Sequence, residues 1–152
     1  AGQAIIIALM ITAITSTQQK KEELKVVTHE MLVMTDGAIE QISSLAESYE
    51  SEVYSKDWIT YIESAQTLRE KSKDKINEIK KTREPVSHRV DIIKSLGSTK
   101  AGKLADKVHY CYRECYSYVV GETGKYPNYL TKYNKLVEEY KKAAEELLEF
   151  VD

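Results

Sequence analysis

The most reactive side chains that fall close together are two cysteines and a histidine, Cys111, Cys115 and His109. The two thiols are four residues apart, which places them on one face of a helix. A disulfide at this spacing has poorly directed Cβ atoms and would distort a regular helix. Buried free thiols that act as small hydrophobic side chains are the favoured interpretation, and a disulfide gains weight if this part of the chain lies outside the cytoplasm.

A metal site at these residues is not expected. His109 is two residues from Cys111, about 200° round a helix, so the two side chains point to different sides. A tetrahedral site would need further ligands, and no His-Glu-x-x-His or Cys-x-x-Cys-His motif supplies them.

No other pattern in the chain points to catalysis. His29 and His88 are isolated, and the sequence has no glycine-rich phosphate loop and no Gly-x-Ser-x-Gly turn. We therefore expect no catalytic residue, no cofactor and no small-molecule substrate. An enzyme is the least expected class.

The charge balance argues against nucleic acid as a partner. The 152 residues carry 22 basic and 24 acidic side chains, a net charge of −2, and both signs are spread along the chain after residue 20. Nucleic-acid binding requires a basic surface.

Eleven tyrosines against one phenylalanine suit an interface, because tyrosine combines an apolar ring with a hydroxyl that favours a solvent-exposed edge. The alternative is that the tyrosines take the place of phenylalanine at half-buried positions of the core. Both interpretations stay open.

The amino end is the least usual feature. No charged side chain occurs from Ala1 to Gln19, after which Lys20 and Lys21 end the segment. As a helix this stretch is about 28 Å long, marginally enough for a hydrocarbon layer of about 30 Å. Its apolar side chains surround the helix, so the whole circumference must be buried in lipid or against other copies. The residues expected in this membrane or filament-core helix are Ala1, Gln3, Ile5, Ile6, Ile7, Leu9, Met10, Ile11 and Ile14.

The same helix is predicted to continue to about residue 53. An apolar stripe at steps of three or four follows the lysines, and Asp36–Gly37 is the only weak point, where a kink could form. The stripe consists of Leu24, Val27, Met31, Met34, Ala38, Ile42, Leu45 and Tyr49. We therefore divide the chain into an apolar assembly or transmembrane segment, 1–21, and a helical bundle head, 22–152.

Four further helices are predicted, and no strand-like alternation competes with them. Ser55–Asp57 supplies turn chemistry, Pro85 ends the second helix, and Gly97 ends the third in the left-handed conformation. The expected inner face of the second helix holds Trp58, Ile62, Ala65, Ser72, Ile76 and Ile79. The predicted ranges are 58–83, 86–95, 100–120 and 128–151. The expected fold is all-α: a long N-terminal helix whose C-terminal half packs in a small antiparallel helical bundle.

The amino end resembles a mature type IV pilin of the archaeal kind, processed at a class III signal peptide. The resemblance rests on the non-Met start Ala1-Gly2-Gln3, the apolar core Ala4–Ile14 and the amphipathic continuation, and it covers roughly residues 1–35. Two departures stand out. Bacterial type IV pilins carry a glutamate where this chain has Ile5, and most pilin heads contain a β-sheet.

The resemblance implies a structural subunit of an extracellular filament. Such a subunit is first inserted in the membrane and then moves into a helical homopolymer, where the apolar helices pack together in the core. Its partners would be copies of itself, with roles that range from cell adhesion to motility. All-round hydrophobicity suits lipid first and neighbouring helices afterwards.

Two alternatives remain. The first is an extracytoplasmic helical sensor or adhesin domain that is held in the membrane by the N-terminal segment. The second is a helical virion coat protein, against which the neutral charge counts.

Overall fold

The computed structural model describes the backbone of residues 2–54, 58–121 and 128–152. It describes side chains in these ranges from residue 16 onward, except those of residues 58 and 59. The described backbone contains helices and no strand, which confirms the all-α prediction. The predicted turn at Ser55–Asp57 and residues 122–127, between the last two predicted helices, lie outside the described residues.

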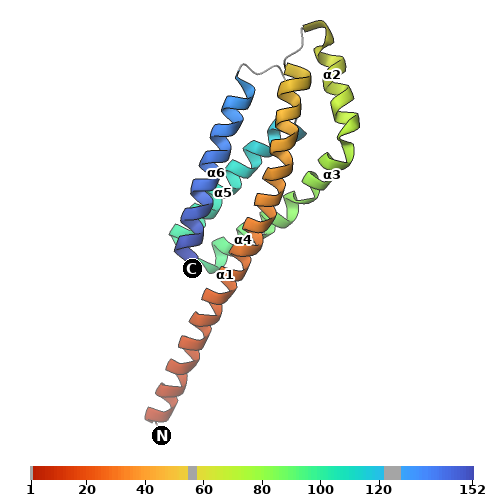
Figure 1. Cartoon of the computed structure of the whole chain (residues 1–152). Coiled ribbons are helices and arrows are strands. Elements are labelled where there is room, and N and C mark those ends of the chain that lie inside the picture. Colours follow the sequence, from red (N-terminus) through yellow and green to blue (C-terminus); the bar gives the residue numbers. More distant parts are fainter. Residues whose placement is uncertain (1, 55–57, 122–127) are drawn as a thin grey trace.

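The helices form a bundle in which the chain runs up, down, up and down (Figure 1). The first leg is α1, which continues directly into a short π-helix, η1. The second leg is built from α2, α3 and α4, and the third and fourth legs are α5 and α6. The bounds are α1 Gly2–Tyr49, η1 Glu50–Tyr54, α2 Trp58–Lys71, α3 Lys73–Lys81, α4 Arg83–Leu96, α5 Thr99–Val120 and α6 Tyr129–Val151.

Helix α1 is the long helix that the sequence predicts, and it contacts α4, α5 and α6. Most of its predicted stripe is buried, with Met31, Ile42 and Tyr49 fully so, whereas Leu24, Val27 and Met34 are partly buried. The helix runs without interruption through Asp36–Gly37, its weakest point by propensity. Helical hydrogen bonding therefore outweighs the weaker propensity of one glycine, about 1 kcal/mol.

The prediction of one helix over 58–83 that ends at Pro85 is wrong. The second leg breaks at Ser72 and again at Thr82, and Pro85 lies in the first turn of α4. A proline ring clashes with the carbonyl four residues earlier, here that of Lys81, so the break falls one turn before the proline. The Thr82 hydroxyl donates to the Ile79 carbonyl at 2.7 Å, which satisfies the end of α3.

Gly97 ends helix α4 as predicted, but the predicted left-handed conformation is wrong. It follows α4 in an extended conformation, with φ −87° and ψ 173°, rather than in the left-handed region. Glycine is required here for steric reasons, because a Cβ atom would lie 2.8 Å from both the Ala101 Cβ and the Ile93 carbonyl oxygen. The tight connection between α4 and α5 depends on this close approach.

The inner face of α2 differs from the prediction. Ile62 is 59% exposed, whereas Tyr61 and Leu68 are buried. The helix packs mainly against η1 at the far end of the bundle, so its orientation follows that contact rather than a continuous stripe with α3. Trp58, the first residue of the predicted face, has its side chain outside the described set.

Tyrosines fill much of the core. Tyr112, Tyr129, Tyr133 and Tyr140 are almost completely buried. Buried hydroxyls need hydrogen-bond partners, and each of these four has one. Tyr140 donates to the Asp36 carboxylate at 2.6 Å, Tyr133 bonds the Ser43 hydroxyl at 2.7 Å, Tyr129 donates to the Tyr118 carbonyl at 2.8 Å, and Tyr112 bonds the Thr82 hydroxyl. These bonds join separate legs of the bundle or neighbouring helices.

Replacing Ile42 with alanine should destabilise the bundle by about 2–5 kcal/mol, because it opens a cavity at a fully buried position of α1. Urea denaturation followed by circular dichroism measures this loss. Gln41→Ala on the exposed side of the same turn is the matched control and should change stability little. Equal stability of the two variants would show that α1 does not pack through this stripe.

Candidate functional site

Helix α1 is much longer than the bundle that packs against it. Its N-terminal part extends beyond the other helices, next to the end where α6 finishes (Figure 1). Side chains 16–23 are exposed, and packing begins at Leu24. The predicted assembly residues Ala1, Gln3, Ile5, Ile6, Ile7, Leu9, Met10, Ile11 and Ile14 have side chains outside the described set. Within the described part, no helix is long and apolar enough to cross a membrane.

The outer face of α1 carries two exposed valines directly beyond this projecting part. Val26 is 53% and Val33 is 72% exposed, whereas Met31 and Ile42 on the inner side of the same helix are fully buried. The two are seven residues apart and so lie on one face. Together with Lys25, His29, Glu30 and Met34 they line a shallow hollow of about 520 Å³. We call Val26 and Val33 the outer valine pair.

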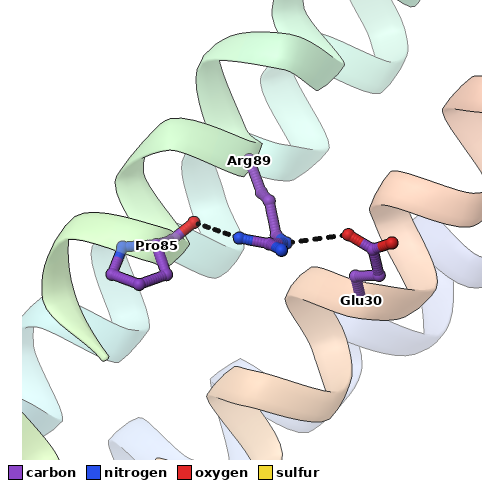
Figure 2. Close-up of polar contacts among 3 residues, drawn as sticks. All are labelled: Glu30, Pro85 and Arg89. Atoms are coloured by element: carbon purple, nitrogen blue, oxygen red, sulfur yellow. Dashed lines mark hydrogen bonds and ion pairs between the residues drawn. The ribbon is translucent and has the colours of Figure 1, made fainter. Parts of the chain in front are cut away.

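Polar contacts hold α1 in place on both sides of the outer valine pair. On one side, the Arg89 Nε of α4 donates to the Glu30 carboxylate at 3.0 Å, while its guanidinium also donates to the Pro85 carbonyl at 3.2 Å (Figure 2). On the other side, His29 Nε2 lies 2.9 Å from the Asp152 carboxylate after α6. The valines therefore lie beside two contacts that connect α1 to α4 and to the end of α6.

The apolar surface continues into a groove between α1 and α6. Val33 belongs to this groove as well, together with Leu32 of α1 and Ala144 and Leu148 of α6. The groove has a volume of about 330 Å³ and meets the first hollow at His29 and Val33. This arrangement can bury the apolar face of a helix, the usual way in which an amphipathic helix binds a groove.

The two cysteines are buried and free. Burial raises the pKa of Cys115 to about 12, Cys111 beside it acts in the same direction, and the hydrogen bond with Tyr133 opposes it. Burial likewise raises the pKa of Cys111. A thiol in this state is protonated at neutral pH and is a poor nucleophile and metal ligand.

The histidines do not converge on a site. His29 and His88 are exposed, and His109 stacks beside Tyr112 at a centroid distance of 6.3 Å. Burial, followed by the charge of Arg113, lowers the pKa of His109. Among the described residues, no three His, Cys, Asp or Glu side chains gather as a metal site would require.

Comparison of the chain with protein-family models, curated proteins and solved structures finds no match. The surface must therefore be interpreted from its own residues.

The sequence analysis did not identify the outer valine pair, because Val26 and Val33 fall outside the inner stripe of α1. Their spacing of seven residues was the available signal for a second apolar face.

The stability of the bundle should fall as pH rises above about 9. Burial raises the pKa of Cys115, and it raises those of Tyr129, Tyr133 and Tyr140 above their ordinary value of 10.0. At a pH near the ordinary pKa values of these groups, the unfolded chain releases protons that the folded chain still holds. The stability that these groups contribute is therefore fully present below the pKa values of the unfolded chain. It is lost as pH rises from those pKa values toward the higher pKa values of the folded chain.

Urea denaturation at a series of pH values between about 7 and 11 measures this dependence, and Tyr133→Phe should make it shallower because one titrating group is removed. A free energy of unfolding that stays constant up to about pH 11 would contradict the burial of these groups.

Proposed function

We propose that this chain is a structural subunit of an extracellular filament of the type IV pilus kind. In this proposal the N-terminal part of α1 packs against the same part of neighbouring copies in the filament core. The subunit is held in the membrane through the apolar segment before assembly. The bundle forms the outer part of the filament at the cell surface.

The observation that carries the proposal is the outer valine pair. Isolated exposed valines are common, but here two lie on one face of a helix that also projects beyond the bundle. A helix that packed only within its own bundle would gain nothing from apolar residues on its outer side. A neighbouring copy of α1 laid along this face would bury both valines together with the groove beside them.

The sequence before residue 20 supports the same proposal. It has no charged side chain, is apolar from Ala4 to Ile14 apart from Thr12, and leads without a break into the helix that bears the outer valine pair. Lipid can cover such a helix, and so can identical helices, whereas water cannot do so favourably. Repeated contacts between different surfaces of identical subunits produce a filament when they do not close into a ring.

Val33→Asp should prevent assembly, because a carboxylate would be buried without a partner between neighbouring helices. Ile7→Asp in the apolar segment should have the same effect. Both variants should keep the circular dichroism spectrum and urea midpoint of the unmodified chain, since Val33 is 72% exposed and residue 7 precedes the bundle. Negative-stain electron microscopy of purified protein measures assembly.

Gln41→Asp is the matched control, because Gln41 is exposed about two turns further along α1 and lines neither the hollow nor the groove; it should still assemble. A monodisperse monomer or dimer formed by the unmodified chain would refute the filament proposal. Normal filaments from both Val33→Asp and Ile7→Asp would refute packing through α1.

A further inference from the structure

A positively charged hollow of about 600 Å³ lies where the end of α3, the start of α4 and the C-terminal half of α5 meet. Three exposed cations line it, Lys80, Arg83 and Arg113. The described lining includes no acidic side chain. None of the three cations belongs to an ion pair within the described part of the chain, whereas Lys81 and Arg89 nearby do. We call this feature the basic hollow.

The rest of the basic hollow is mainly aromatic and apolar, and Ser117 and Gly121 complete its lining. Tyr112, Tyr116 and Val120 contribute to its lining, and the Arg83 guanidinium lies 5.7 Å from the centre of the Tyr116 ring. A cation placed over an aromatic face is held in position by the ring. Cations around an apolar surface suit a partner that brings carboxylates on apolar stems.

The last turns of α6 offer that chemistry. Residues 143–152 contain four carboxylates and no basic side chain. Asp152 bonds His29, but Glu145, Glu146 and Glu149 are exposed and belong to no ion pair in the described part of the chain. Phe150 is 42% exposed beside them and adds an apolar ring.

The two surfaces cannot meet within one chain. The Lys100 ammonium at the start of α5 lies 5.1 Å from the centre of the Phe150 ring, so the acidic end of α6 is level with the beginning of α5. Arg113 comes thirteen residues later in the same helix, about 20 Å along its axis. No residue of α6 is among the described residues that line the basic hollow.

We infer that the basic hollow binds the acidic end of α6, Glu146 and Glu149 above all, from a second copy of this chain. The contact joins two different surfaces, so it repeats from copy to copy and need not close. This inference rests on the proposed function. It also deepens that function, because the contact sets the displacement of one subunit along its neighbour at about 20 Å. The contact along α1 is apolar, whereas this one is electrostatic.

Charge reversal tests the pairing. Arg83→Glu with Arg113→Glu should raise the protein concentration needed for assembly by at least about tenfold, because attraction becomes repulsion across several pairs. Glu146→Lys with Glu149→Lys should do the same. The two sets combined in one chain should restore assembly. Lys75→Glu on α3 and Glu63→Lys on α2 are exposed controls outside both surfaces and should leave assembly unchanged.

Carbodiimide cross-linking gives a second, direct readout, because it joins an amine to a carboxylate that already touches it. We expect a bond from the Lys80 amine to the Glu146 or Glu149 carboxylate in assembled material. In a mixture of ¹⁵N-labelled and unlabelled chains, mass spectrometry should find peptides of mixed label. Circular dichroism of each reversed variant checks that the bundle is intact.

The outcomes separate this inference from the proposed function. Filaments that are unaffected by either reversal and show no such cross-link would overturn the inference and leave the filament intact. Loss of assembly in Arg83→Glu with Arg113→Glu that the combined variant does not restore would overturn it too, since another anion would then occupy the hollow. Mixed-label cross-links in small oligomers without filaments would uphold the contact and refute the filament.

Discussion

The burial of one stripe of α1 is the constraint on which the rest of the structure depends. Met31, Ile42 and Tyr49 on this stripe are fully buried, and α4, α5 and α6 all pack against the same helix. A continuous helix cannot turn its other sides toward the same core. The outer valine pair and the side chains of residues 16–23 therefore stay exposed within a single chain. In the proposed filament, neighbouring copies would cover them.

Tyrosine gives this small core its specificity. A buried ring supplies the apolar area of phenylalanine, while its hydroxyl requires a partner in a fixed place. Tyr140 and Tyr133 of α6 find theirs on α1, at Asp36 and Ser43, and Tyr112 of α5 finds its partner at Thr82. The same bonds raise the cost of a shifted register, because a displaced helix would leave several hydroxyls buried and unpaired.

The sequence predicts α1, α5 and α6 to within a few residues, since each is long and has a clear apolar period. It fails on the second leg, where Pro85 acts on the carbonyl of Lys81 one turn upstream and Gly97 is required by a close approach that no local pattern encodes. The outer valine pair and the basic hollow were missed for another reason. The first lies off the main stripe, and the second joins residues from three helices that only the fold brings together.

Hydrogen–deuterium exchange, compared between dispersed and assembled protein, tests the central claim that neighbouring copies cover the exposed part of α1. Amides of residues 31–49 should exchange slowly in both forms, because the bundle protects them. Amides of residues 16–23 should exchange quickly in the dispersed chain and at least about tenfold more slowly after assembly. Equally fast exchange of residues 16–23 in both forms would contradict the claim.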